Sequence, residues 1–269
     1  MSRVQRPVAA LVLALSLLVA HCTSLAPKPD PAVVTALAPT GSLRIAVYLG
    51  SPTSLVRSPL TGEAKGVAVD LGQAMAAGLG VAAMLVEFPN NAEALAAVKE
   101  GRADFAFTNA TPARANDMDF SPALFMVEQG YLVPNDSALH SAAVVDQRGV
   151  RIGVARGSTS ERELARTVHA GTLVPVPSLK DAARMLEDGS IDAFATNKAI
   201  LHELSDSVPG SRVLPGAYGR ESFAIGIPKG REQALPWLRR FVEEAKANGQ
   251  VMQAIERAGL RGVTPVDKK

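Results

Sequence analysis

Apolar residues recur at helical spacing in two stretches of the chain, NAEALAAVKE (91–100) and LKDAARMLED (179–188). Each stretch follows a short apolar run that is typical of a strand, LVEFPN before the first and LVPVPS before the second. Further upstream, GSLRIAVYLGS (41–51) is similar to GVRIGVARGS (149–158). Each half of the chain is therefore predicted to run strand, helix, strand, helix, strand, with parallel strands joined by helical crossovers.

A repeated phrase closes each half. EGRADFAFTNA (100–110) returns as DGSIDAFATNK (188–198). Four residues recur at a constant offset: Gly101 with Gly189, Asp104 with Asp192, Thr108 with Thr196, and Asn109 with Asn197. The similarity of the flanks makes a chance pair of acidic turns a poor explanation. We predict a two-lobed α/β protein in which each half of the chain builds one wall of a shared site.

The composition fits this architecture and excludes other classes of protein. At 269 residues with 47% hydrophobic side chains, the chain can fill two modest cores. The formal charge is +2, but Arg3 and Arg6 belong to a leader without acidic residues, and their removal leaves 26 of the 28 basic side chains against 26 acidic ones. A neutral chain has no broad field for nucleic acid or an anionic membrane. No HExxH or CxxC motif occurs, and we expect neither a metal nor a cofactor.

The start of the sequence is predicted to be a secretory signal peptide over 1–22. Its arginines precede an apolar run from Val8 to Ala20, which is short for a membrane span and typical of a signal peptide. Cys22 follows in LLVAHC, which resembles a bacterial lipoprotein box except that His21 stands where a small residue is usual. Cys22 is therefore a candidate for lipidation, and the Pro- and Ala-rich segment 23–40 is predicted to be a flexible tether. We expect a periplasmic protein, either free or anchored through Cys22.

TPAR, from Thr111 to Arg114, is the first candidate for binding chemistry. It follows the predicted strand ADFAFTN, and Pro112 suits the first position of a helix with Thr111 as its N-cap. Arg114 then stands in the first helical turn, beside backbone N–H groups that have no partner within the helix. A guanidinium, a hydroxyl and free amides at one strand end predict a receptor for a carboxylate.

The second half supplies a matching site. The strand RIGVA and one arginine are followed by Gly157, which permits a sharp turn. Ser158 and Thr159 then present hydroxyls and amides at a helix N-terminus, where an anion is favoured, and Ser160 and Glu163 fit a capping box. Ligands of open α/β sheets bind beyond the carboxyl ends of strands. Two such edges facing each other predict a cleft.

Taken together, these motifs resemble the bacterial extracellular solute-binding proteins of family 3. The resemblance runs from about 41 to 263, nearly all of the expected mature chain. GVAVDL (66–71) looks like the family's G-F-D-V-D-L segment, and GVRIGVARGSTSE looks like its second-lobe strand and glycine turn. TPARANDMDFSPAL (111–124), with Gly101 and Asp104 before it, looks like the G-x-x-D…T-x-x-R…D-F-S-x-P signature.

The resemblance implies a type II periplasmic binding fold of the Venus-flytrap kind. Such a fold has two lobes, two mixed sheets with helices on both faces, and a hinge of two strands. We place the crossings near 130–135 and 213–222. Lobe 1 would then comprise 41–132 and 221–265, and lobe 2 would comprise 136–216.

The resemblance also implies a function without catalysis. Such proteins capture a small solute between the lobes and deliver it to an ABC permease in the inner membrane; we expect a monomer without a nucleic-acid partner. In the family, the arginine matched by Arg114 grips the ligand's carboxylate, and the position of Thr159 helps from the other lobe. The other expected ligand-binding residues are Thr108, Asn109, Thr111, Ser158, Asn197, Tyr48, Ser51 and Thr53.

Two departures from the family bear on the ligand. Thr53 stands where an aromatic residue often packs on the ligand, and Asn197 stands where amino acid binders usually have an aspartate that pairs with the α-ammonium. A buried ammonium without a counter-charge costs several kcal/mol. We therefore expect a small carboxylate or related anion, with an α-amino acid less favoured. Asp70 is an alternative counter-charge, although its position better fits a role at the start of a helix.

Two other functions stay open on the sequence. Cyclohexadienyl dehydratases use the same fold and eliminate water from a carboxylate substrate with an acid in the cleft. The candidate acids here are Glu128 and Glu221, near the expected crossings. A sensor domain is the other possibility, and it would need a separate partner protein because no membrane segment follows in GVTPVDKK.

Overall fold

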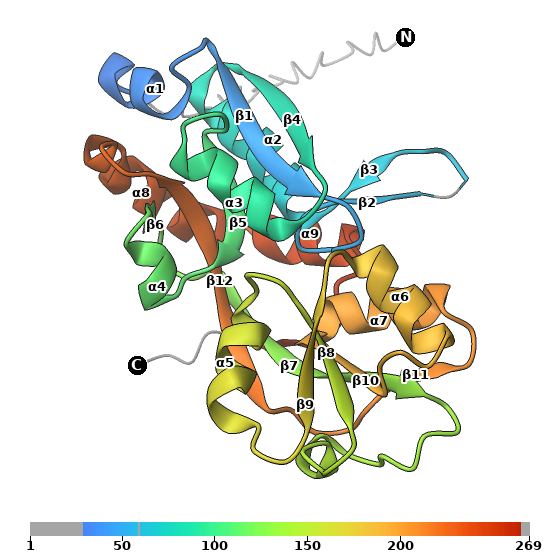
Figure 1. Cartoon of the computed structure of the whole chain (residues 1–269). Helices are drawn as coiled ribbons and strands as arrows, with labels where there is room; N and C mark the ends of the chain where they lie inside the picture. Colours follow the sequence, from blue (N-terminus) through green and yellow to red (C-terminus); the bar gives the residue numbers. More distant parts are fainter. Residues whose placement is uncertain (1–28, 59, 265–269) are drawn as a thin grey trace, which may run out of the picture.

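The computed structural model describes residues 29–58 and 60–264, which form two lobes of alternating strands and helices (Figure 1). The predicted signal peptide and Cys22 lie outside the described residues. The elements in the first part of the chain are α1 (Pro31–Leu37), β1 (Ser42–Tyr48), β2 (Val56–Arg57), β3 (Ala64–Lys65), α2 (Val67–Leu79), β4 (Ala82–Phe88), α3 (Asn91–Lys99), β5 (Phe105–Asn109), α4 (Pro112–Ala115) and β6 (Met118–Phe120).

The remaining elements begin with β7, one of the two strands that join the lobes. They are β7 (Phe125–Pro134), η1 (Ala142–Val144), β8 (Arg151–Ala155), α5 (Thr159–Thr167), β9 (Thr172–Val176), α6 (Leu179–Glu187), β10 (Ala193–Asn197), α7 (Lys198–Ser207), β11 (Ser211–Val213), β12 (Gly219–Pro228), η2 (Glu232–Ala234), α8 (Leu235–Ala247), α9 (Gln250–Arg257) and β13 (Val263–Thr264).

The two predicted repeats are confirmed. In the first repeat, β1 lies between β4 and β5 and pairs with both in parallel, so that Ile45 is opposite both Leu85 and Phe105. In the second repeat, β8 lies between β9 and β10, again in parallel. Helices α2 and α3, and then α5 and α6, make the crossovers. Equivalent strand ends of the two repeats therefore carry equivalent loops.

The repeated aspartates account for the repeated phrase. The carboxylate of Asp104 accepts hydrogen bonds of 2.8–2.9 Å from the backbone N–H and the guanidinium of Arg44. Asp192 accepts the same set from Arg151, at 2.7–3.0 Å. Each aspartate thus ties the third strand of its repeat to the start of the first. Asp104 is fully buried and also accepts a hydrogen bond of 3.0 Å from Arg231, so two arginines neutralise it.

Two long antiparallel strands, β7 and β12, join the lobes, with Gly219 of β12 opposite Gln129 of β7. β12 continues into lobe 1 beside β5, and β7 continues into lobe 2 beside β10. Both strands overlap the crossings expected near 130–135 and 213–222 and extend further into lobe 1. The two expected sheets are therefore linked into one hydrogen-bonded order, β4-β1-β5-β12-β7-β10-β8-β9, with β2-β3 as a separate pair.

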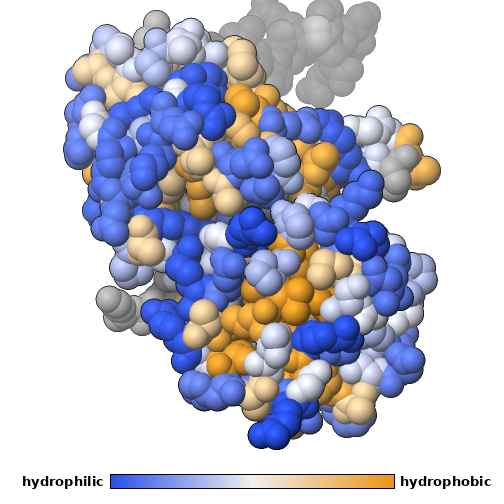
Figure 2. All heavy atoms as spheres, in the orientation of Figure 1, coloured by the Kyte–Doolittle hydropathy of each residue, from blue (hydrophilic) through white to orange (hydrophobic). Residues whose placement is uncertain are grey.

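Separate apolar cores hold the lobes. In lobe 1, Ile45 of β1 and Leu238 of α8 belong to one buried cluster, which also includes α2 and α9. In lobe 2, two clusters cover opposite faces of β8 and β10. Beneath the cleft, Phe107, Phe125 and Phe223 pack with ring centroids 5.5–5.7 Å apart. In the space-filling view of Figure 2, apolar surface gathers on the lower lobe, and hydrophilic side chains predominate where the lobes meet.

The flexible tether predicted over 23–40 is wrong from residue 31, where α1 begins. Asp30 caps this helix, since its Oδ1 accepts a hydrogen bond of 2.8 Å from the N–H of Ala32, and Pro31 takes the first helical position. Leu37 is fully buried in the lobe 1 core. The proline that suggested an extended linker instead starts a helix, and lobe 1 extends upstream of the expected boundary.

Candidate ligand-binding site

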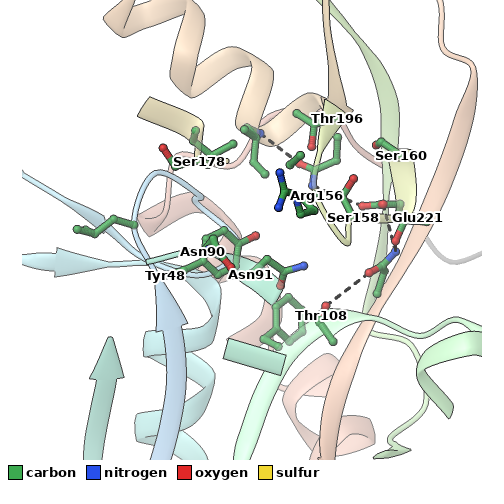
Figure 3. A pocket seen from close by; sticks show the side chains of 18 of the residues that line it. Tyr48, Asn90, Asn91, Thr108, Arg156, Ser158, Ser160, Ser178, Thr196 and Glu221 are labelled. Atoms are coloured by element: carbon green, nitrogen blue, oxygen red, sulfur yellow. Dashed lines mark hydrogen bonds between the residues drawn. The ribbon is translucent and has the colours of Figure 1, made fainter. Parts of the chain in front are cut away.

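A cleft between the lobes receives residues from both repeats and from the hinge strand β12 (Figure 3). It lies beyond the carboxyl ends of β1, β5, β8 and β10, where open α/β sheets bind ligands. The structure brings these expected ligand-binding residues together in the cleft: Tyr48, Thr108, Asn109, Arg114, Ser158, Thr159 and Asn197.

Arg114 belongs to the lobe 1 wall. α4 starts as predicted, with Thr111 as N-cap, and the Thr111 hydroxyl accepts a hydrogen bond of 3.3 Å from the Arg114 N–H. The arginine is only 7% exposed, and its Nη1 donates to Thr108 Oγ1 at 2.6 Å and to the carbonyl of Asn109 at 3.2 Å. Its buried Nε has no hydrogen-bond partner among the described residues. The guanidinium is thus fixed in place and keeps donor capacity for an anion.

Three of the expected ligand-binding residues do not line the cleft. Thr111 supports Arg114 indirectly, because its hydroxyl caps α4. Ser51 and Thr53 are buried, and their hydroxyls lie 2.8 Å apart in a hydrogen bond. The loop folds inward because the hydroxyl of Ser54 accepts a hydrogen bond of 2.9 Å from the N–H of Tyr48. Ser51 and Thr53 therefore support Tyr48 instead of facing a ligand.

The lobe 2 wall is the N-terminus of α5. Gly157, with φ of +71°, turns the chain after β8. Ser158 is the N-cap and accepts a hydrogen bond of 3.0 Å from the N–H of Glu161, whose carboxylate accepts one of 2.6 Å from the N–H of Gly157. The capping box expected at Ser160 and Glu163 therefore lies two residues earlier, because the helix starts sooner than its polar pattern indicated.

The two lobes touch directly across the cleft. The amide of Asn109 in lobe 1 donates a hydrogen bond to the hydroxyl of Thr159 in lobe 2. A Cβ added at Gly157 would lie 3.3 Å from the Cβ of Ala92, at the start of α3. The turn of lobe 2 thus packs closely against a helix of lobe 1, and the cleft is narrow enough for both walls to hold one small molecule.

Glu221 of β12, which the sequence offered only as a candidate acid, is a central residue of the site. It is 7% exposed and lines the cleft. Its Oε1 accepts hydrogen bonds from Asn109 Nδ2 and Gln129 Nε2, both at 3.1 Å, and its Oε2 accepts one of 3.4 Å from Asn197 Nδ2. The donors belong to lobe 1, the hinge and lobe 2. One carboxylate therefore joins all three parts of the fold, beside the asparagine that replaces the family's aspartate.

Arg114 and Glu221 place opposite charges in the cleft, and no ion pair joins them. Burial lowers the pKa of Arg114 to about 10, against the effect of the Glu221 charge, so the arginine stays protonated at neutral pH. Burial raises the pKa of Glu221, and the Arg114 charge opposes that rise. Burial likewise raises the pKa of Tyr48, which keeps the phenol neutral. A cation and an anion that line the same cleft match a zwitterion.

Polar residues that the sequence reasoning did not single out complete the cleft. Asn90 and Asn91 lie at the start of α3, and Ser178 caps α6. Figure 3 shows the side chain of Arg156, from the end of β8, extending into the space between these asparagines and Thr196. Their common signal is position, since each directly follows or lies near the carboxyl end of a strand.

The other charges proposed from the sequence lie outside the cleft. Glu128 accepts a hydrogen bond of 2.6 Å from Lys198 Nζ, and Asp70 accepts one of 3.0 Å from Arg257 Nε. Asp70 is therefore not the counter-charge of a ligand. Within the part of the chain that the structure describes, no cluster of His, Cys, Asp or Glu side chains is arranged to hold a metal ion. The described helices also include none with the length and apolarity of a membrane span.

Known proteins resemble the chain in sequence and in structure. A glutamine-binding protein of Geobacillus stearothermophilus is 29% identical over 119 residues, which are 44% of this chain and 45% of that protein. The chain spans about half the length of the curated relatives it matches. An amino acid ABC transporter substrate-binding protein from Streptococcus pneumoniae, bound to L-arginine, superposes with a TM-score of 0.74 at 20% identity, covering 87% of this chain and 99% of that one.

A second solved structure also has this fold. It is an ancestral amino acid-binding protein, a precursor of cyclohexadienyl dehydratase, with a TM-score of 0.69 at 22% identity, covering 83% of this chain and 97% of that one. At such identities these structures show the fold alone, and they confirm the predicted two-lobed, type II periplasmic binding architecture. The model of the bacterial extracellular solute-binding proteins, family 3, matches residues 43–259. The chain is a member of that family.

Proposed function

We propose that the protein is the solute-binding component of an ABC-type importer and that it captures an α-amino acid in the interlobe cleft. The observation that carries this proposal is the pair of opposite charges, Arg114 and Glu221, which are both buried and both line one cleft. Arg114 would bind the α-carboxylate through its unpartnered Nε and its remaining donor capacity. Glu221 would bind the α-ammonium.

Glu221 changes the ligand preference that the sequence suggested. Neutral Asn197 offers no charge to an ammonium, which favoured a deaminated carboxylate. Glu221 supplies the missing charge from the hinge, and the amide of Asn197 holds its carboxylate at 3.4 Å. A ligand without an ammonium would leave the buried Glu221 charge facing a second anion, which is costly in a site of low dielectric. An α-amino acid is therefore the better ligand.

The family and its relatives support transport as the biological role. Curated relatives are glutamine-binding proteins, and a structural neighbour was solved with L-arginine. By analogy, the partner of this protein would be an ABC permease in the inner membrane, and the protein would act in the periplasm as a monomer. Anchoring through Cys22 would keep it near that membrane.

A dehydratase is the second candidate, and Glu221 is the observation that raises it. A general acid in the cleft must hold a proton to give to the leaving hydroxyl. Here amide N–H groups of Asn109, Gln129 and Asn197 all donate to the Glu221 carboxylate, which is the pattern of an ionised acceptor. The hydrogen bonds therefore favour a binding role for Glu221 over an acid role.

A thermal-shift panel tests the proposed function. The purified protein would be heated with each α-amino acid and with its deaminated counterpart, and incubated separately with prephenate and arogenate to detect turnover. A ligand at a hundred times its Kd adds about 2.7 kcal/mol, or roughly 5–10 °C for a protein of this size. We expect shifts from amino acids and none from deaminated acids. Shifts from deaminated acids alone, or turnover, would overturn the proposal.

A further inference from the structure

The charges that line the cleft are unbalanced. Among the described residues that line it, Arg114 and Arg156 are cationic and Glu221 is anionic, so two positive charges face one negative charge. The α-carboxylate and α-ammonium of an amino acid would use Arg114 and Glu221. One positive charge is then left over, and the remainder of the ligand must meet it.

Arg156 is placed to meet a ligand's side chain. It directly follows β8, and its N–H donates a hydrogen bond of 3.2 Å to the carbonyl of Val176, which anchors the backbone to β9. Its guanidinium makes no hydrogen bond or ion pair with any other residue in 29–58 or 60–264. Figure 3 shows this side chain in the middle of the cleft, between the walls contributed by Asn90 and Thr196.

The neutral polar neighbours of Arg156 are largely committed to their own helices. Asn90 Oδ1 accepts a hydrogen bond of 3.0 Å from the N–H of Glu93 and caps α3. Ser178 Oγ accepts one of 3.1 Å from the N–H of Asp181, donates to its carboxylate, and caps α6. Neither Glu93 nor Asp181 lines the cleft. Arg156 is therefore the group in this part of the cleft with free donors and a net charge.

We propose that Arg156 is a specificity-determining residue that selects α-amino acids with an anionic side chain. The inference rests on the proposed function, because it assumes that Arg114 and Glu221 hold the α-groups. A dicarboxylic amino acid then pairs each of its three charges with one of opposite sign. A cationic side chain would meet Arg156 as a like charge, and a neutral amide would accept a weaker, uncharged hydrogen bond.

Calorimetric titrations with isosteric ligands test this proposal. The full-length protein would be titrated with L-glutamate, L-glutamine, L-aspartate, L-asparagine and L-lysine at low ionic strength, and again as the Arg156→Gln variant. We expect the wild type to bind each acid about tenfold or more tightly than its amide and to bind L-lysine least. In Arg156→Gln, the acid-to-amide ratio should fall about tenfold. The matched control is Arg148→Gln, which removes an exposed arginine of lobe 2 that does not line the cleft.

The outcomes distinguish the role proposed for Arg156 from the proposed function, on which it rests. Tighter binding of amides or of L-lysine by the wild type, or an acid-to-amide ratio that Arg156→Gln leaves unchanged, overturns the role of Arg156 and leaves the proposed function standing. A fall in the ratio that Arg148→Gln reproduces also overturns it, because the effect is then one of net charge. Failure of every amino acid to bind overturns both proposals.

Discussion

Replacement of Glu221 by glutamine is the most informative single change in the cleft. The substitution keeps the shape of the side chain and removes its charge. Glu221 is 7% exposed, so water screens its interaction with a bound ammonium only weakly. Loss of one partner of a buried ion pair costs about 3–5 kcal/mol. The glutamine oxygen still accepts a hydrogen bond, so we take the lower end, about 3 kcal/mol, which is on the order of a hundredfold in Kd.

The sign of the effect should depend on the ligand. Isothermal titration would compare L-glutamate with glutarate, which lacks the ammonium and keeps both carboxylates. In Glu221→Gln, the affinity for L-glutamate should fall about a hundredfold. The affinity for glutarate should rise, because the substitution removes a buried negative charge that faces the ligand. The preference for the amino acid should therefore shrink or reverse.

Glu128→Gln is the matched control, since Glu128 is also a hinge glutamate but pairs with Lys198 outside the cleft. Its affinities for both ligands should stay within about threefold of wild type. Equal losses of affinity for L-glutamate and for glutarate in Glu221→Gln would show a general disturbance of the hinge. Unchanged binding of L-glutamate would show that the ammonium lies elsewhere, and either result refutes the assignment of Glu221.

Two further predictions concern pH and the repeated aspartates. Because burial raises the pKa of Glu221 above its ordinary value of 4.5, L-glutamine affinity should fall as the pH drops through that raised value, and the Glu221→Gln variant should lose this dependence in titrations at several pH values. Asp104→Asn should lower the free energy of unfolding by about 3–5 kcal/mol, because it removes a fully buried partner from Arg44 and Arg231. Asp192→Asn should lower it by only about 1 kcal/mol, because Asp192 pairs with one arginine near the surface. Urea denaturation measures both changes.

The raised pKa of Glu221 should make the stability of the ligand-free protein fall as the pH rises, whereas the affinity for L-glutamine should increase. A group whose pKa is raised on folding binds its proton more tightly in the folded state. Its contribution to stability is fully present below pH 4.5 and is lost as the pH rises through the folded-state pKa. A saturating amino acid places its ammonium beside the ionised Glu221 carboxylate. The bound protein should therefore not lose stability as the pH rises through this range. Thermal melts with and without L-glutamine across that range check the reversal.

The features of the fold that the sequence predicted are those with local or repeated signals. Periodic apolar residues and the paired phrase around Asp104 and Asp192 predicted both repeats, because crossover units carry their pattern within a short segment. Thr111 and Pro112 predicted the start of α4, and hence the place of Arg114, because caps are local chemistry. The segment before β1 was misread because the proline that starts α1 has the same composition signal as a linker.

The parts of the site that escaped prediction depend on distant contacts. Whether Glu221 faces the cleft is set by the register of β12 against β7, and its hydrogen-bond donor Asn109 lies 112 residues away in sequence. Ser51 and Thr53 turned out to be buried because a bond from Tyr48 folds their loop inward. Neither feature leaves a periodic signal in the sequence, so only the assembled lobes reveal them.

Titration of L-glutamate into wild-type protein and into Arg114→Ala tests the central claim most directly. Arg114 is nine-tenths buried and fixed by Thr108 and the N-cap of α4, so its loss should remove the carboxylate receptor without unfolding the lobes, which circular dichroism would verify. We predict a loss of at least a hundredfold in affinity, since charge-assisted bidentate contacts in a desolvated site are worth about 3 kcal/mol or more. Arg148→Ala should bind like wild type. An Arg114→Ala variant that is folded and binds L-glutamate within threefold of wild type would contradict the account.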